Sequence, residues 1–321
     1  MSKSTDWLSH LLDIVPVRGR LDLRCFYGAP WRIDRKPAAA GEIPYHAVLS
    51  GSAMLENPGG GPATRLTAGD VLLLPHGSLH ALHDGSNARP VPAQSFERLN
   101  LAISENAGTG DRLDMLCGHF ILAPPHDRLL RDYLPSQLIV RVAAPVTAEG
   151  ELGTGMQIAD LLSLMRIESA AESLGGRAML NALSTALFTL VLRLAGAAEA
   201  APSGLLAVAS NQRLAPALNA LFQEPGRAWT LPDLARLCHM SRATLARHFQ
   251  ERLGRSANEL LTDIRMALAA NALRKPTASM GAVAEMVGYQ SEAAFQRTFK
   301  QHMGVTPAQW RRTQARAEQD V

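Results

Sequence analysis

The segment SRATLARHFQERLG (241–254) decides how this chain is interpreted, because nearly the same segment, SEAAFQRTFKQHMG, returns at 291–304. In the first copy, Leu245 and Phe249 lie four residues apart and so share the buried face of a helix. The second copy repeats this spacing with two phenylalanines. The matched positions are Ser241/Ser291, Ala243/Ala293, Arg247/Arg297, Phe249/Phe299 and Gly254/Gly304. Two copies of one short unit indicate a target that itself repeats.

Each copy follows a second, shorter helical pattern, TLPDLARLCHM (230–240) or MGAVAEMVGYQ (280–290). A short helix, a tight turn and a second helix form a helix-turn-helix pair, which offers its second helix to the DNA major groove. The second turn is one residue longer than the first and contains Gly288, which adopts a positive φ at little cost. Between the pairs, ELLTDIRMALAANALRK (259–275) predicts a long helix that holds them at a fixed separation.

The outward residues of both copies suit the base edges of DNA. Arginine can donate two hydrogen bonds to guanine, glutamine can pair with adenine, and alanine can contact the thymine methyl group. Two such helices about one DNA turn apart would contact successive major grooves, roughly 34 Å apart. Residues 209–321 carry 15 Lys and Arg against 9 Asp and Glu, which fits a polyanionic partner. The alternative is a helical bundle or adaptor whose arginines are merely solvated.

Residues 213–316 resemble the DNA-binding domain of the AraC family of bacterial transcription regulators. The resemblance rests on AEMVGYQSEAAFQRTFKQHMGVTPAQWR (284–311), whose VGY, FQRTFK, Gly and TPAQWR elements have the family's spacing. It implies DNA-contacting positions on both second helices, with Arg242 adding a donor to the first. The expected DNA-binding residues are Arg242, Ala243, Ala246, Arg247, Glu292, Ala293, Gln296 and Arg297.

The N-terminal half predicts short strands separated by Gly- and Pro-rich turns, as in a β-barrel or sandwich. GDVLLLPHGSLHALHD (69–84) spells G-x5-P-x-G-x2-H-x3-D and resembles the second conserved motif of cupin barrels. HAVLSG (46–51) keeps one histidine of the first cupin motif, but Val48 stands where a second is usual. The expected fold is therefore α+β, with a cupin-like barrel and flanking helices preceding an all-α domain.

His46 and His80 are the metal-ligand candidates of these motifs, and Cys117 is a candidate third ligand. A structural or sensory Zn or Cu ion is one hypothesis. The other is that the motif only shapes a β-hairpin, with His80 as a hydrogen-bonded barrel residue. A catalytic metal site generally needs at least three protein ligands. We therefore expect no enzyme, and keep a metal-dependent cupin oxygenase or isomerase as the alternative function.

Three cysteines are too few for a disulfide framework and suit a reducing cytoplasm. Cys238 lies among apolar residues and is expected in the core. A cupin ahead of an AraC-type domain, with cysteines at 25 and 117, resembles the branch that responds to reactive chlorine or electrophiles. That resemblance implies that Cys25 and Cys117 are redox sensors that form a disulfide on oxidation. A small organic effector inside the barrel is the competing hypothesis.

The predicted domains are a cupin-like sensor with a helical segment (1–195), a linker (196–208) and the DNA-binding domain (209–321). Helices expected at 156–174 and 177–195 either cover the barrel or pair two subunits. The longest apolar run, 186–197, is interrupted by Arg193, and the N-terminus has no signal-peptide core, so a cytoplasmic location is expected. The sequence thus predicts a sequence-specific transcription regulator that acts as an activator. Its expected partners are double-stranded DNA, RNA polymerase, an effector or oxidant, and a second copy of the chain.

Overall fold

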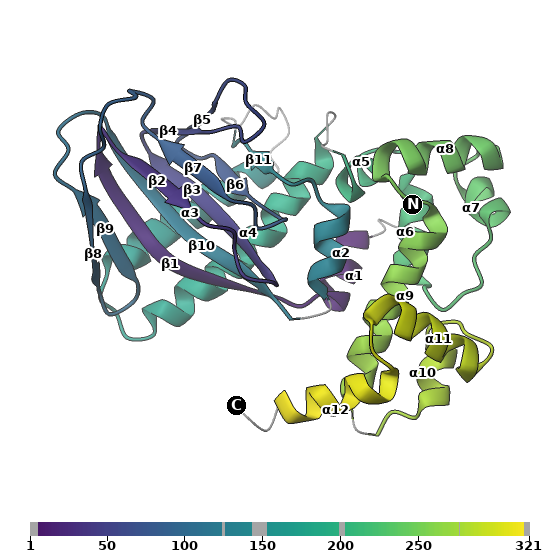
Figure 1. The fold of residues 1–321 in the computed structure, drawn as a ribbon. Helices are drawn as coiled ribbons and strands as arrows, with labels where there is room; N and C mark the ends of the chain where they lie inside the picture. Colours follow the sequence, from purple (N-terminus) through teal and green to yellow (C-terminus); the bar gives the residue numbers. More distant parts are fainter. Residues whose placement is uncertain (1–5, 124–125, 143–152, 199–202, 276, 318–321) are drawn as a thin grey trace. The chain divides into compact units, whose positions relative to one another are not determined.

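The computed structural model describes residues 6–123, 126–142, 153–198, 203–275 and 277–317. The chain forms two compact units (Figure 1). The first, here called the sheet unit, contains Val17–Leu122 and Pro135–Ala198. The second, the helical unit, contains Met1–Pro16, Ala123–Leu134 and Glu199–Val321. All described strands belong to the sheet unit, and the predicted α+β class is confirmed.

The sheet unit is built from two β-sheets whose neighbouring strands run antiparallel, apart from the parallel pair β1 and β9. The larger sheet has the strand order β11 (Leu138–Val140), β6 (Val71–Leu73), β3 (Glu42–Ser50), β10 (Arg112–Leu122), β1 (Val17–Gly28), β9 (Ala102–Asn106) and β8 (Ala93–Glu97). The smaller sheet has the order β2 (Arg32–Arg35), β7 (His80–His83), β4 (Ser52–Leu55) and β5 (Thr64–Thr67).

The core of this unit lies between the two sheets. Alternate side chains of a strand point to the same face, so β10 contributes Leu113, Met115 and Cys117 to one buried cluster. Ile33 and Leu82 of the smaller sheet belong to the same cluster. Burial of this apolar surface stabilises the unit and leaves the two sensor-candidate cysteines within its core.

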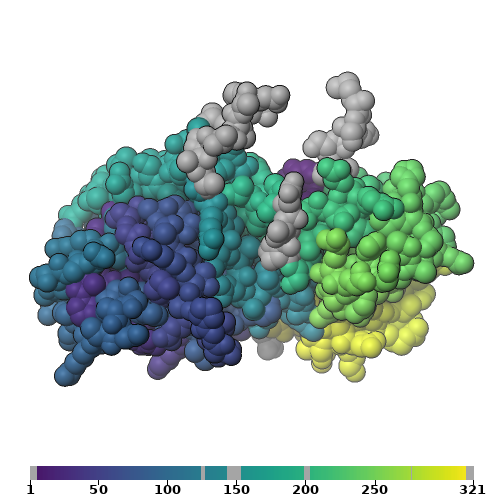
Figure 2. Space-filling model, turned by 90° about the horizontal axis from the view of Figure 1, so that it is seen from above, coloured from purple at the N-terminus to yellow at the C-terminus, as the bar shows by residue number. Residues whose placement is uncertain are grey.

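Helices α3 (Thr154–Ala170) and α4 (Gly176–Ala197) pack on the larger sheet, and their teal atoms lie together along one side of the strands in Figure 2. On α4, Thr185 Oγ1 accepts a hydrogen bond from the Gly19 amide at 2.8 Å. Arg24 of β1 donates to the Arg166 carbonyl oxygen of α3 at 2.9 Å and to Asp114 Oδ2 of β10 at 2.7 Å. The predicted helices therefore cover the barrel.

Among the described residues, α4 alone is long and apolar enough to cross a membrane by length and composition. In this structure its apolar side chains serve the core of the sheet unit: Leu180, Leu187 and Val191 are buried.

The helical unit contains two helix-turn-helix pairs, α7 with α8 and α10 with α11, and α9 lies between the pairs (Figure 1). Thr230 with Asp233, and Ser256 with Glu259, form capping boxes that satisfy amide groups at the starts of α7 and α9. The helices are α1 (Trp7–Ile14), α2 (His126–Tyr133), α5 (Leu205–Ala209), α6 (Ala215–Gln223), α7 (Leu231–Leu237), α8 (Arg242–Leu253), α9 (Ala257–Arg274), α10 (Met280–Met286), α11 (Glu292–Met303) and α12 (Pro307–Ala317).

The grouping of α1, α2 and α5 differs from the predicted domain boundaries. Helices α1 and α2 lie within the predicted 1–195 domain, and α5 overlaps the predicted 196–208 linker, yet all three belong to the helical unit. On α1, Leu11 is fully buried, and the Ile14 carbonyl oxygen accepts a hydrogen bond from Asn271 Nδ2 of α9 at 2.8 Å. These short apolar faces need partners that lie far away in the sequence, so local patterns do not identify their unit.

Candidate functional site

The helices α8 and α11 expose the same set of positions. Residues 241–250 and 291–300 follow an identical order of exposed, half-buried and buried side chains. Leu245 and Phe249 of α8 are fully buried, as are Phe295 and Phe299 of α11. The predicted outward residues are all exposed: Arg242, Ala243, Ala246 and Arg247 on α8, and Glu292, Ala293, Gln296 and Arg297 on α11.

The ends of both helices are set by the serines and glycines that the sequence repeat contains. The Ser241 side chain accepts a hydrogen bond from the Thr244 amide at 3.1 Å, and Ser291 accepts one from the Ala294 amide at 3.2 Å. Gly254 and Gly304 end the helices at φ values of 74° and 76°, a left-handed conformation that favours glycine. The repeat therefore produces two helices of equal length, 12 residues each.

The two turns differ in how they reach a positive φ. The first turn uses His239 at φ 51°, whereas the second uses Gly288 at φ 79°. A Cβ atom on Gly288 would lie 2.3 Å from the carbonyl oxygen of Gly226. Only glycine therefore fits this turn without displacing backbone. Buried Ala235 and Ala284 allow the two helices of each pair to pack closely.

The charged groups on these faces have weak partners of their own. Arg247 Nε lies 3.9 Å from Glu251 on the same exposed helix surface, a contact that adds little stability. On α11, Gln296 Nε2 donates to Glu292 Oε1 at 2.9 Å. The guanidinium of Arg247 can therefore exchange this contact for a base or a phosphate at small cost. That these residues contact DNA stays a prediction.

The sensor candidates Cys25 and Cys117 lie side by side in the core of the sheet unit. Cys25 pairs with Met115 across β1 and β10, so Cys117 stands two positions further along the same face. Their Sγ atoms are 3.8 Å apart, and both cysteines are free and buried. A disulfide bond is about 2.05 Å long, and diagonal neighbours on two strands lie about 7–8 Å apart, so the bond requires the backbones of β1 and β10 to move toward each other as the sulfurs approach.

A chain of hydrogen bonds leads from Cys117 through two histidines. His46 Nδ1 lies 3.2 Å from Cys117 Sγ, and His46 Nε2 lies 2.8 Å from His80 Nε2. His80 Nδ1 donates to the Ser78 carbonyl oxygen at 3.0 Å, because a carbonyl can only accept. With both rings neutral, His80 Nε2 then accepts from His46, which leaves His46 Nδ1 to accept the thiol proton of Cys117.

The pKa values of these groups follow from burial. Desolvation lowers the pKa of His46 well below its usual value and also lowers that of His80, which keeps both rings neutral. The hydrogen bond between the thiols lowers the pKa of Cys25, and the same contact together with burial raises that of Cys117. The positive charge of Arg35 acts against that rise.

A cavity of about 230 Å³ reaches Cys117 but not Cys25. Its polar lining includes His46, His80, His119, Arg35, Lys36 and Asp22. Arg35 of β2 was not among the residues that the sequence singled out. It stands opposite His80 of β7 in the smaller sheet, and only that strand register reveals the pairing. The cavity therefore places the sulfur of Cys117 at the edge of a space large enough for a small solute, beside the basic side chains of Arg35 and Lys36.

The predicted metal ligands do not form a coordination set. Cys117 contacts Nδ1 of His46 whereas His80 contacts Nε2 on the opposite side of the ring, so the three donors do not converge. His119 is engaged with Asp22, at 2.6 Å from Nδ1 to Oδ2. Over the described ranges, no group of three or more His, Cys, Asp and Glu side chains is arranged to hold a metal ion. The donors present do not fit a Zn or Cu site.

Comparison with known proteins agrees with both halves of this geometry. A family model described as "Cupin" matches residues 6–195, and one described as "Helix-turn-helix domain" matches residues 234–313. An HTH-type transcriptional regulator of Haemophilus influenzae is 31% identical over 310 residues, which cover 96% of this chain and 99% of that protein. An AraC-like transcription regulator of Streptomyces lividans is 31% identical over 309 residues, covering 96% of this chain and 98% of its own.

A third relative is the Escherichia coli protein named "RCS-specific HTH-type transcriptional activator RclR". It is 29% identical over 306 residues, which cover 95% of this chain and 97% of that protein. In all three cases the similarity extends over nearly the full length of both chains.

Proposed function

This chain belongs to the AraC-like family of helix-turn-helix transcriptional regulators and carries a cupin domain, and from that premise we propose that oxidation of Cys25 and Cys117 controls its binding to DNA. It is a DNA-binding regulator, as its relatives are. The alternative of a metal-dependent cupin enzyme is not favoured, because these relatives are named as regulators and the candidate ligands do not converge.

The observation that carries the redox proposal is the pairing of two free thiols 3.8 Å apart, one of which borders a cavity. A purely structural cysteine has no need of a polar cavity or of a histidine that accepts its proton. The name of the Escherichia coli relative, an activator specific for RCS (reactive chlorine species), supports a reactive chlorine oxidant for this chain as well.

The chemistry balances with hypochlorous acid as the oxidant. As the sulfur of Cys117 attacks the chlorine of hypochlorous acid, the O–Cl bond breaks and the thiol proton passes by way of His46 to the departing hydroxide, which leaves as water. Cys25 then attacks the sulfur of the sulfenyl chloride: the S–S bond forms, chloride leaves, and the Cys25 proton is released. Two thiols and one oxidant thus yield a disulfide, water, chloride and one proton. Burial and the contact with Cys25 raise the pKa of Cys117, which opposes its reaction, but Cys117 reacts first because it is the one of the two sulfurs that borders the cavity.

DNA binding is assigned to the exposed faces of α8 and α11. Arg242, Arg247 and Arg297 are the donors suited to guanine or phosphate, and Gln296 suits adenine. The exposed alanines Ala243, Ala246 and Ala293 allow close approach to thymine methyl groups. Glu292 accepts from cytosine or, as in its bond with Gln296, orders its own helix. Binding of this kind weakens steeply with salt, because displaced counterions supply much of the affinity.

Three further assignments rest on family membership alone: a cytoplasmic location, RNA polymerase as a partner, and a homodimer. Linking two copies would multiply the affinity for paired half-sites. A small anionic effector is the second candidate for the signal, favoured by the basic residues Arg35 and Lys36 around the cavity.

The test compares full-length wild type with Cys25→Ala, Cys117→Ala and the double variant, using Cys238→Ala as the buried control. Each is titrated against a duplex selected from a random-sequence library by the reduced protein, before and after one equivalent of hypochlorite. We expect a Cys25–Cys117 disulfide by peptide mass spectrometry and a changed affinity in wild type and in Cys238→Ala. The double variant should bind DNA with no response. An unchanged oxidant response in the double variant would overturn the proposal.

A further inference from the structure

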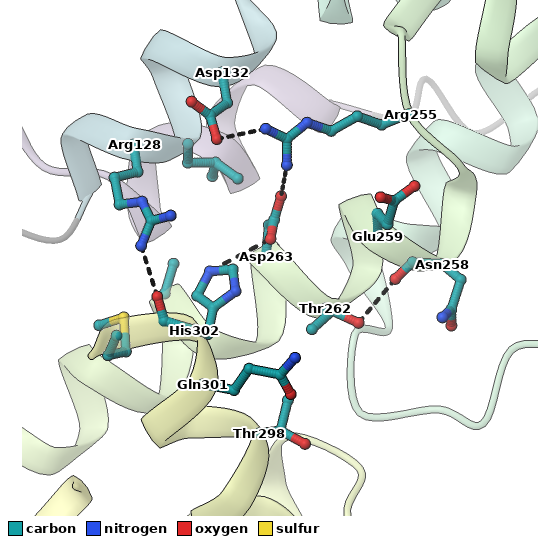
Figure 3. Close-up of a pocket in the computed structure, with 13 residues that line it drawn as sticks. Arg128, Asp132, Arg255, Asn258, Glu259, Thr262, Asp263, Thr298, Gln301 and His302 are labelled. Atoms are coloured by element: carbon teal, nitrogen blue, oxygen red, sulfur yellow. Dashed lines mark hydrogen bonds and ion pairs between the residues drawn. The ribbon is translucent and has the colours of Figure 1, made fainter. Parts of the chain in front are cut away.

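Helix α2 lies outside both helix-turn-helix pairs, yet it contacts the ends of both DNA-binding helices (Figure 3). Arg128 Nη1 donates to the carbonyl oxygen of His302, in the last turn of α11, at 2.6 Å. Asp132 Oδ2 accepts from Arg255 Nη2 at 2.8 Å, and Arg255 directly follows Gly254, which ends α8. One short helix thus holds both termini through charged hydrogen bonds.

The two contacts are joined at Asp263 of α9 (Figure 3). Arg255 Nη1 lies 3.6 Å from Asp263 Oδ2, and His302 Nε2 lies 3.3 Å from Asp263 Oδ1. The hydroxyl of Tyr133, the last residue of α2, also donates to Asp263. Asp263 is largely buried, with a side-chain exposure of 12%, so its ion pair with Arg255 is stronger than a surface ion pair. Burial lowers the pKa of His302, so this ring meets Asp263 as a neutral hydrogen-bond partner. The positions of α8, α9 and α11 are therefore coupled through α2.

The contact is formed around a cavity rather than by close packing. The cavity measures about 350 Å³ and is lined by residues of α2, α9 and α11, including the polar side chains of Asn258, Thr262, Thr298 and Gln301. A close-packed apolar contact resists displacement, because any shift loses many atomic contacts at once. Long polar side chains around a cavity can exchange partners over a shift of an ångström or more. The arrangement suits an element that holds one geometry and can adopt a second.

The path of the chain connects α2 to the candidate redox pair. Helix α2 follows β10 and precedes β11, two strands of the larger sheet, while α2 itself belongs to the helical unit. Cys117 lies on β10, the strand that leads into α2. A disulfide between Cys117 and Cys25 would pull β10 toward β1, and α2 is the next described element after β10 along the chain and belongs to the helical unit.

We infer that α2 is a second positioning element, beside the connecting helix α9, that sets the spacing of α8 and α11, with Arg128, Asp132 and Tyr133 as its positioning residues. We further infer that α2 carries the state of the Cys25–Cys117 pair to the two DNA-binding helices. This second part rests on the redox function proposed above, whereas the first part stands without it.

The experiment measures how strictly the protein requires the spacing between its two half-sites. One inserted base pair turns the second half-site by about 35° relative to the first. The probes are the selected duplex and a derivative with one base pair inserted between the half-sites. The proteins are full-length wild type, Arg128→Ala, Arg128→Lys and Arg131→Ala. Arg131 is the matched control, since it pairs with Asp127 of its own helix.

Wild type should lose affinity about tenfold or more on insertion, because the loss of even one charged hydrogen bond to the displaced half-site weakens binding by about that factor. The spacing ratio is the affinity for the selected duplex divided by the affinity for the duplex with the insertion. Arg128→Ala should reduce this ratio at least threefold. Arg131→Ala should keep it, and so should Arg128→Lys, because a lysine still donates to the His302 carbonyl. A merely structural role would lower the melting temperature and weaken both duplexes equally. An unchanged ratio in Arg128→Ala, with or without weaker binding, therefore overturns the positioning role.

Oxidation separates the second part of the inference from the redox function. In wild type, the disulfide should change the spacing ratio; in Arg128→Ala the disulfide should form equally fast and change nothing. If Arg128→Ala responds to oxidation as wild type does, transmission through α2 is wrong although redox control stands. If wild type forms the disulfide and its DNA binding is unaffected, the redox function fails together with transmission. In that case, the spacing ratios of the reduced wild type and reduced Arg128→Ala still test whether α2 has the positioning role.

Discussion

Replacing Gly288 by alanine should destabilise the second helix-turn-helix pair far more than the same change at Gly304. Both glycines have a positive φ, 79° and 76°. The left-handed conformation costs an L-residue about 1–2 kcal/mol of folding free energy. Alanine also restricts the unfolded chain, which offsets about 0.4–1 kcal/mol of that cost. Gly304→Ala should therefore cost about 1 kcal/mol, since no atom lies within 4 Å of its added Cβ.

At Gly288 the added Cβ meets two obstacles. The Gly226 carbonyl oxygen would lie at 2.3 Å and Arg265 Nη2 at 2.8 Å. The first is backbone, so no side-chain rotation relieves it, and such overpacking costs about 1–3 kcal/mol more. The total for Gly288→Ala is about 2–4 kcal/mol. Because 1.4 kcal/mol is a factor of ten, the two variants should differ about 5- to 150-fold in the local opening constant.

Hydrogen–deuterium exchange of peptides from α10 and α11 measures this opening in the full-length protein. Gly288→Ala should exchange faster in both helices and bind the selected duplex more weakly, while Gly304→Ala should stay near wild type. Peptides from the sheet unit serve as the internal reference. Equal exchange rates in the two variants would refute the argument that the close approach to Gly226, rather than φ alone, requires glycine here.

Two further predictions concern the DNA-binding surface and the histidine pair. Arg297→Ala should weaken binding to the selected duplex by about 1–3 kcal/mol and relax the preference at one base pair, with exposed Arg312→Ala as the control; equal losses on all duplexes would identify a phosphate contact. His46 is neutral in the folded protein because burial lowers its pKa, while its pKa in the unfolded chain is about 6.5. Only the unfolded chain then takes up this proton, so stability is full above about pH 6.5 and falls below it by up to about 1.4 kcal/mol per pH unit. His46→Gln should flatten this loss in urea unfolding of the sheet unit between pH 7.5 and 5.5, and an equally steep loss in the variant would contradict the assignment.

The helical unit could be predicted in detail because its signals are local. A cap, a buried pair four residues apart and a closing glycine lie within fourteen residues of sequence, and the structure has each at its predicted place. The short helix α7 shows the limit of such signals. Leu231 and Leu237 suit a core by type, but each is 39% exposed because they lie at the two ends of a seven-residue helix.

The site of the sheet unit, around Cys25 and Cys117, was less predictable, because it is formed by residues that are distant in sequence. The cysteines at 25 and 117 were paired through family resemblance, since nothing local indicates that β1 and β10 are neighbours. Arg35 was missed for the same reason: its place beside the cavity follows from the register of β2 with β7. The predicted metal ligands, His46 and His80, do lie together, but the direction of their ring nitrogens was not readable from sequence.

The membership of α1, α2 and α5 in the helical unit has a consequence for modular engineering. A truncated gene starting at codon 209 would omit α1, α2 and most of α5, stripping hydrophobic cover from residues such as Phe222, whose ring lies 6.2 Å from that of Trp7. Hybrid proteins that join residues 1–195 to the DNA-binding domain of another regulator would contain α1 and α2 without the helices against which they pack. Exchange of signal-receiving and promoter-recognising parts between such proteins is therefore expected to need several crossover points, and whole-gene inheritance is the simpler route to a working regulator.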